Sequence, residues 1–219
     1  MVVLRHEASG AAQFLARHVR ANVVNAGDGQ HEHPTQALLD LYTIRERLGR
    51  LQDVRVAIVG DVLHSRVARS NIWGLTKMGA HVTVAAPQTL LPPELDALGV
   101  ARTHRLDEAL DGAQVVYLLR LQRERQDGGF LPTLREYART FGLRTEHLER
   151  LLPECLIMHP GPINRGVEVD NAVADGSRSL ILDQVTNGVA IRMAVLFLLW
   201  TGREGTPAVR EMLRQGEVG

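Results

Sequence analysis

The sequence is poor in cysteine and in aromatic residues, and it has no excess charge of either sign. Cys155 is the one cysteine among 219 residues, which excludes an internal disulfide framework and a cysteine-ligated metal site. Lys and Arg together number 25, as do Asp and Glu, so no overall field attracts the chain to nucleic acid or to a membrane surface. These absences favour a small-molecule function in a reducing compartment, and we expect a cytoplasmic protein with no nucleic-acid partner.

Long apolar runs and a secretory leader are missing as well. The longest apolar run, residues 193–200, is too short to span a bilayer. Arg5, His6 and Glu7 interrupt the start of the chain, which is unlike a signal peptide. We therefore expect no membrane association.

Apolar runs alternate with segments of helical period. The predicted strands are residues 2–4, 23–24, 54–59, 81–85, 115–119 and 155–158, and the predicted helices are residues 9–19, 34–48, 66–78, 93–98, 107–110 and 188–199. This alternation is typical of βα units, so the predicted fold class is α/β with two doubly wound parallel-sheet domains. A domain boundary is expected near residues 48–52.

Two segments carry further structural expectations. Val189, Met193, Leu196 and Trp200 share one face of the last predicted helix, and we expect that face to be part of the core. Residues 121–145 are polar and predict a long loop with a helical patch.

Several predicted strands run into cationic or amide side chains. The residues in question, each at or shortly after the end of an apolar run, are Arg5, Arg66, Arg120 and Gln122. In open α/β sheets ligands bind outside the carboxyl ends of the strands. The sequence therefore predicts one pocket edge lined with cations, which suits a small ligand with several negative charges.

The segment His33-Pro34-Thr35-Gln36 opens the clearest predicted helix. The N-terminal N–H groups and the dipole of a helix favour a negative ligand, although a histidine that merely caps a core helix fits the same pattern. His33 has no nearby carboxylate pair in a metal-binding arrangement, so we predict no metal.

Two loops could present backbone groups to a ligand. His159-Pro160-Gly161-Pro162 follows an apolar run, and its prolines fix φ while its glycine allows close approach; taken alone, it could also be a plain surface bend. Gly60-Asp61 opens a strand-to-helix loop but lacks the further glycines of a dinucleotide fingerprint and a Walker lysine, so it indicates nucleotide binding only weakly.

Together these segments resemble the aspartate carbamoyltransferases of the aspartate/ornithine carbamoyltransferase superfamily. The matching text runs from end to end and comprises Val3-Leu4-Arg5-His6, Asn25-Ala26-Gly27-Asp28-Gly29, His33-Pro34-Thr35-Gln36-Ala37-Leu38-Leu39-Asp40, Gly60-Asp61 with Ser65-Arg66, Arg120 with Gln122 and Glu124-Arg125, His159-Pro160-Gly161-Pro162, and Gln184-Val185-Thr186-Asn187-Gly188-Val189-Ala190.

The resemblance implies an activity and a set of site residues. The reaction is transfer of the carbamoyl group of carbamoyl phosphate to the α-amine of L-aspartate, giving N-carbamoyl-L-aspartate and phosphate in de novo pyrimidine biosynthesis, without a cofactor. The implied catalytic residues are Arg5 and His33, which polarise the carbonyl. The implied carbamoyl phosphate ligands are Arg5, His33, Gln36, Gly161 and Pro162, with a cis bond before Pro162, and the implied aspartate ligands are Arg66, Arg120 and Gln122.

The resemblance also implies a domain plan and an assembly. The family's first domain starts with a segment, bearing a Ser-Thr-Arg-Thr phosphate loop and a lysine lent to the adjacent subunit, that has no match here. We therefore expect an incomplete first domain of residues 1–50 joined by a closing helix, residues 185–219, and an aspartate-binding domain of residues 51–184. The family implies a homotrimer, with or without regulatory or dihydroorotase chains, and we expect the chain alone to be inactive and to associate over an exposed edge.

Three alternatives remain open. Ornithine carbamoyltransferases carry a cysteine where Pro160 stands, and Arg120 with Gln122 suits a dicarboxylate better than ornithine. A noncatalytic homologue that assembles with an active partner accounts for the missing phosphate loop but not for the retained arginines. A plain nucleotide-binding module is the third alternative.

Overall fold

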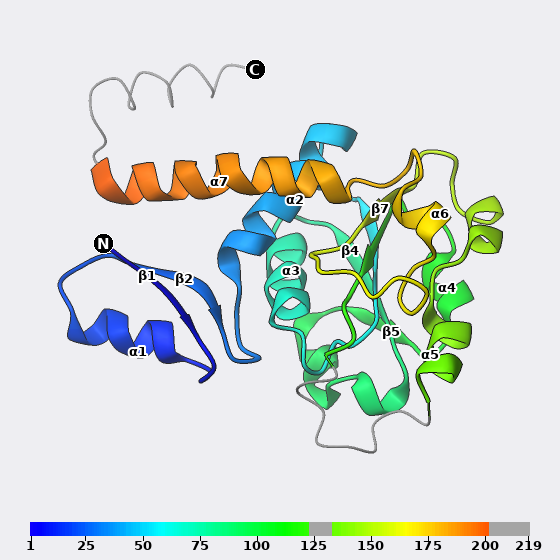
Figure 1. The fold of residues 1–219 in the computed structure, drawn as a ribbon, viewed down its shortest axis with the longest axis horizontal. Coiled ribbons are helices and arrows are strands. Elements are labelled where there is room, and N and C mark those ends of the chain that lie inside the picture. Colours follow the sequence, from blue (N-terminus) through cyan, green and yellow to red (C-terminus); the bar gives the residue numbers. More distant parts are fainter. Residues whose placement is uncertain (123–132, 202–219) are drawn as a thin grey trace.

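The computed structural model describes residues 1–122 and 133–201 (Figure 1). The first part of the chain contains β1 (Val2–His6), α1 (Ala11–His18), β2 (Val23–Asp28) and α2 (Pro34–Leu48). The larger part contains β3 (Arg55–Val59), α3 (Arg66–Lys77), β4 (His81–Ala85), η1 (Gln88–Leu90), η2 (Pro93–Leu98), β5 (Ala101–Thr103), α4 (Leu106–Leu110), β6 (Val115–Leu118), α5 (Leu134–Phe141), η4 (Thr145–Glu149), β7 (Leu156–Met158), α6 (Asn171–Ala174) and α7 (Ile181–Thr201).

The larger sheet has the order β5-β4-β3-β6-β7, and all its pairings are parallel. The chain moves outward from β3 to β5, then returns to the other side of β3 with β6. A crevice therefore opens between the carboxyl ends of β3 and β6, where the winding direction reverses. The prediction of a doubly wound α/β domain is confirmed for this part of the chain.

The core of this sheet lies in its central strands. Val56, Ala57 and Ile58 of β3 and all four residues of β6 are buried. Cys155, just before β7, is fully buried, and burial raises the pKa of its thiol to about 12. It is therefore an unreactive core residue, in keeping with its apolar surroundings in the sequence.

The smaller sheet consists of the parallel pair β1 and β2, connected through α1. From it α2 leads to the larger sheet and packs against α3 and α7, with α7 lying across it in Figure 1. Gly49 ends α2 with a φ of 73°, a conformation that favours glycine. The expected boundary at residues 48–52 falls in the connection between α2 and β3.

The expectation for the face of α7 is wrong. The helix starts at Ile181, earlier than predicted, and Val189, Met193 and Trp200 are 61%, 64% and 81% exposed. The side that packs on α2 is the polar one, because α2 presents hydrogen-bonding side chains to it. The paired residues of α7 are Asp183, Gln184, Asn187 and Arg192.

By length and composition, α7 is the one helix in the described part of the chain that could cross a membrane. Its polar contacts with α2 agree equally well with a helix that packs within an α/β protein. Four short elements were not predicted, namely η1, β5, η4 and α6. In the predicted loop 121–145 the helical patch is α5, and residues 123–132 lie outside the described residues.

Candidate active site

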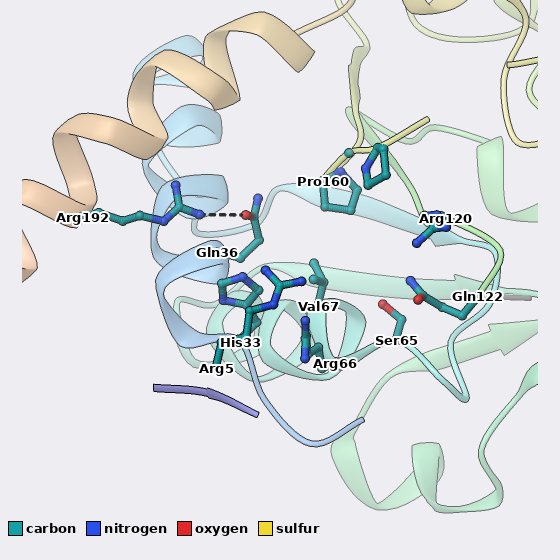
Figure 2. A pocket seen from close by; sticks show the side chains of 12 residues that line it. Arg5, His33, Gln36, Ser65, Arg66, Val67, Arg120, Gln122, Pro160 and Arg192 are labelled. Atoms are coloured by element: carbon teal, nitrogen blue, oxygen red, sulfur yellow. Dashed lines mark hydrogen bonds between the residues drawn. The ribbon is translucent and has the colours of Figure 1, made fainter. Parts of the chain in front are cut away.

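A cavity of about 410 Å³ opens at the carboxyl ends of β3, β6 and β7, between α2, α3 and α7 (Figure 2). Its lining residues come from β1, from the starts of α2 and α3, from the segments after β6 and β7, and from α7: Arg5, His33, Gln36, Ser65, Arg66, Val67, Arg120, Gln122, Pro160, Gly161, Pro162 and Arg192. The eight residues singled out from the sequence are therefore brought together in one place. This cavity lies at the crevice that the strand order predicts between the carboxyl ends of β3 and β6.

The lining is strongly cationic. Four arginines reach it from four different elements or loops, and within residues 1–122 and 133–201 no acidic residue lines it. Guanidinium groups form paired hydrogen bonds to carboxylates and phosphates. A cavity with this lining is suited to bind a compact ligand that carries several negative charges, and to stabilise an oxyanion that forms there.

His33 and Gln36 occupy the start of α2. Pro34 takes the first helical position, where its missing N–H is not needed, and the backbone N–H of His33 donates to Oγ of Ser70 on α3 at 2.9 Å. Burial, followed by the charges of Arg66, Arg192 and Arg5, lowers the pKa of His33 to about 4. At neutral pH the ring is therefore uncharged and can donate a hydrogen bond through one nitrogen only.

Arg66 extends from the first turn of α3 toward the smaller sheet. Ser65 caps that helix by accepting from the N–H of Ala68 at 3.1 Å. The Arg66 guanidinium donates to the carbonyl of Gly29 at 3.4 Å and passes over Gly27, where a Cβ would lie 2.7 Å from Cζ of Arg66. Glycine at position 27 therefore leaves the space in which this guanidinium lies.

Arg120 and Gln122 follow β6 in a segment held from two sides. The N–H of Gln122 donates to Oδ2 of Asp61 at 3.1 Å, and the N–H of Leu121 donates to Oε1 of Glu168 at 2.7 Å. Both carboxylates are buried, and burial raises the pKa of Glu168. The backbone around Arg120 is thus anchored by fixed acceptors behind the cavity wall.

The loop after β7 forms the opposite wall. Nδ1 of His159 accepts from the N–H of Gly161 at 2.9 Å, which turns the chain toward the cavity. Burial, and then the charge of Arg120, lowers the pKa of His159 to about 4, so this ring is also neutral. The bond between Gly161 and Pro162 is cis, as the resemblance implies.

The sequence interpretation missed one charged residue of the cavity, Arg192. Its signal was present, since it is a lone cation within the apolar stretch of α7. Gly188 lies one turn earlier, where a Cβ would come within 2.5 Å of the Arg192 guanidinium. Glu124 and Arg125, part of the resemblance, lie outside the described residues. Within the described ranges no group of three potential ligands could hold a metal ion.

Two family descriptions match consecutive parts of the chain. Residues 1–46 match the carbamoyl-P binding domain of aspartate/ornithine carbamoyltransferase, and residues 52–199 match its Asp/Orn binding domain. The second match alone covers more than half of the chain.

Curated relatives agree with this match. The aspartate carbamoyltransferase catalytic subunit of Heliobacterium modesticaldum is 61% identical over 95% of the chain and 67% of its own length. The corresponding subunit of Desulfitobacterium hafniense is 57% identical over 92% of the chain and 65% of its own length. The chain thus spans about two thirds of the length of the curated relatives it matches.

Solved structures share the fold. Aspartate transcarbamoylase from Trypanosoma cruzi, in complex with carbamoyl phosphate and aspartate, matches with a TM-score of 0.80 and 30% identity over 89% of this chain and 65% of that one. Ornithine carbamoyltransferase from Pyrococcus furiosus matches with a TM-score of 0.79 and 29% identity over 90% of this chain and 65% of that one.

Proposed function

Because the chain belongs to the aspartate/ornithine carbamoyltransferase family, we propose that its cavity binds carbamoyl phosphate and L-aspartate and transfers the carbamoyl group to the α-amine. The products are N-carbamoyl-L-aspartate and phosphate, an early step of pyrimidine biosynthesis. One observation carries the proposal: four arginines converge on a cavity in which none of the described lining residues is acidic. Both substrates are anionic, and together they need several cationic partners.

The carbamoyl phosphate half of the site is assigned to Arg5, His33, Gln36, Gly161 and Pro162. The aspartate amine attacks the carbamoyl carbon, a C–N bond forms, and the carbonyl oxygen becomes an oxyanion beside Arg5 and His33. The C–O bond to phosphate then breaks, and the departing phosphate accepts the amine proton. Fixed donors that meet the oxyanion lower the barrier without reorganisation, and a neutral His33 can serve as one of them.

The aspartate half is assigned to Arg66, Arg120 and Gln122. Two guanidinium groups match the two carboxylates of aspartate, and the Gln122 amide adds a neutral donor. Ornithine would instead place a terminal ammonium among these arginines, and no carboxylate in the described part of the lining would receive it. The charge of the cavity therefore favours aspartate over ornithine as the acceptor.

The domain plan and the setting belong to the same proposal. Residues 1–50 with the closing segment 185–219 are assigned to carbamoyl phosphate binding and residues 51–184 to aspartate binding. Trimeric assembly, regulatory or dihydroorotase partners and a cytoplasmic location follow from the family resemblance, with no cofactor required.

Calorimetric titration of the full chain with N-(phosphonacetyl)-L-aspartate tests the proposal. This compound is bound by the Trypanosoma cruzi relative and joins a phosphonate to an aspartate in one molecule. We expect saturable binding that L-aspartate-like dicarboxylates compete for and ornithine does not. Formation of N-carbamoyl-aspartate from the two substrates is measured in parallel. Binding without turnover would agree with the expectation that the chain alone is inactive, whereas no binding of the bisubstrate compound would contradict the proposed function.

A further inference from the structure

Asp40 is a fully buried carboxylate where four elements meet. Its Oδ1 accepts from Nε2 of Gln36 at 3.1 Å and from Nε2 of Gln184 at 2.8 Å. Its Oδ2 accepts from Nδ2 of Asn71 at 2.8 Å and from the hydroxyl of Tyr117 at 2.6 Å. Donors from α2, α3, β6 and α7 thus fill the acceptor sites of one carboxylate.

Asp40 determines which way the Gln36 amide faces. An ionised carboxylate can only accept hydrogen bonds, so the NH2 group of Gln36 must lie on the Asp40 side. The amide oxygen is left on the other side, where it accepts from Nη2 of Arg192 at 3.2 Å (Figure 2). A carbonyl oxygen has two lone pairs, and the second is available to an N–H group of a ligand in the cavity.

Asp40 also supports the opposite wall of the cavity. Gln184, held by Asp40, accepts through Oε1 from the N–H of His159 at 2.9 Å. His159 in turn holds Gly161 of the loop that lines the cavity. One carboxylate, itself outside the cavity lining, is therefore connected to residues on both sides of it.

We propose that Asp40 is a positioning residue that presents the oxygen of Gln36 to the amino group of the carbamoyl ligand. The site thereby prefers a phosphate ligand that carries an amide over one of the same shape that carries a methyl group. This inference rests on the proposed function, in which Gln36 contacts carbamoyl phosphate, and adds to it the residue that orients the Gln36 amide. The preference is expected to be about tenfold, the effect of one hydrogen bond in a buried site.

The test compares two phosphonates that differ in one group: phosphonoacetamide, which has the NH2, and 2-oxopropylphosphonate, which has a methyl in its place. Burial raises the pKa of Asp40 to about 6 against the opposing effect of its hydrogen bonds, so titrations at pH 8 examine the ionised form. Calorimetry on the full chain should show about tenfold tighter binding of the amide by the wild type, and equal binding by Asp40→Ala and Gln36→Ala.

A matched control separates positioning from stability. Tyr117→Phe removes one donor to Oδ2 and leaves both donors to Oδ1 in place. It should lower thermal stability while keeping the preference for the amide. In a Gln36→Ala background, Asp40→Ala should change the ratio of the two affinities by less than about twofold, because its effect passes through Gln36.

The outcomes distinguish the inference from the function. A wild type that binds neither phosphonate overturns both. Equal binding of the two by the wild type, or a preference that survives Asp40→Ala, overturns the role of Asp40 alone. If Asp40→Ala does not fold, Asp40→Asn replaces it, and the side-chain ¹⁵N resonance of Gln36 reports whether its NH2 is still bonded. The preference for the amide ligand should be lost when the resonance shows that the Gln36 NH2 group is no longer bonded. A full preference in a variant whose Gln36 NH2 group is released contradicts the inference.

Discussion

The two sides of the cavity belong to parts of the molecule that differ in how deeply their side chains are buried. Arg66, at the start of α3, and Arg120, just after β6, belong to the part built on the five-stranded sheet, whose strands β3 and β6 are almost wholly buried. Arg5 extends from β1, where Val3 is 58% exposed, and Phe14 on the adjacent α1 is 66% exposed. The difference shows that the outline of a binding site depends on local contacts at strand ends, whereas stability depends on buried area, which is concentrated on one side.

The largest expected effect is a loss of stability caused by a core substitution in the five-stranded sheet, the more deeply buried side. Ile58→Ala removes a fully buried side chain from the centre of β3 and should lower the free energy of unfolding by about 3 kcal/mol. Val3→Ala, in the exposed strand β1, should lower it by less than about 1 kcal/mol. Urea unfolding followed by circular dichroism compares the two, and equal losses would show that both sheets share one cooperative core.

The next largest effect is a loss of ligand affinity when a guanidinium group of the cavity is removed. Arg66→Ala should weaken binding of N-(phosphonacetyl)-L-aspartate by roughly 10- to 100-fold, because charge-assisted hydrogen bonds to a carboxylate are lost. Arg165→Ala is the matched control, since that arginine pairs with Asp175 and is not among the lining residues. Calorimetry should show less than twofold change for the control. A similar loss in both variants would indicate a general effect of charge.

A smaller effect tests how the two sides meet. Gly27→Ala places a methyl group 2.7 Å from the Arg66 guanidinium carbon and should weaken the same ligand by about tenfold. Gly10→Ala is the control: Gly10 also has a positive φ, 83°, but a Cβ there meets nothing within 4 Å. Both variants should lose about 1 kcal/mol of stability from backbone strain, and only the first should lose affinity. Equal affinities would mean that Arg66 does not depend on the space above Gly27.

The smallest expected effect is the contribution of His33 to the pH dependence of stability. Burial and three arginines hold the pKa of His33 near 4, below its ordinary value of 6.5. Below pH 6.5 the unfolded chain therefore takes up a proton before the folded chain does, and acidification favours unfolding. From pH 7 to pH 6 the wild type should lose roughly 0.7 kcal/mol more stability than His33→Asn, in which this ionisable group is absent. Denaturation at the two pH values measures the difference, and a greater loss in the variant would reverse the sign.

Much of the site could be predicted because its residues follow readable patterns. Arg120 follows a buried apolar run, and His33 precedes a proline-started helix, so both positions could be located from spacing alone. Such positions can be predicted because the end of a strand and the start of a helix are determined by residues nearby in the sequence.

The parts that escaped prediction depend on contacts distant in sequence. The buried side of α7 is the polar one because α2 offers Asp40 and Thr43 to it, which the apolar stripe of α7 could not reveal. For the same reason the place of Arg192 in the cavity depends on how α7 packs on α2, where Arg192 bonds to Gln36. The strand β5 spans three residues, too few for a periodic pattern.

The buried thiol of Cys155 has a practical consequence for probe chemistry. Because it is inaccessible and protonated at neutral pH, the chain supplies a background without a reactive thiol. A cysteine introduced at the exposed position of Val189 or Trp200 could then carry a single spin label or fluorophore. Such labels would report directly on what approaches the outer face of α7, while the cavity residues remain those of the natural sequence.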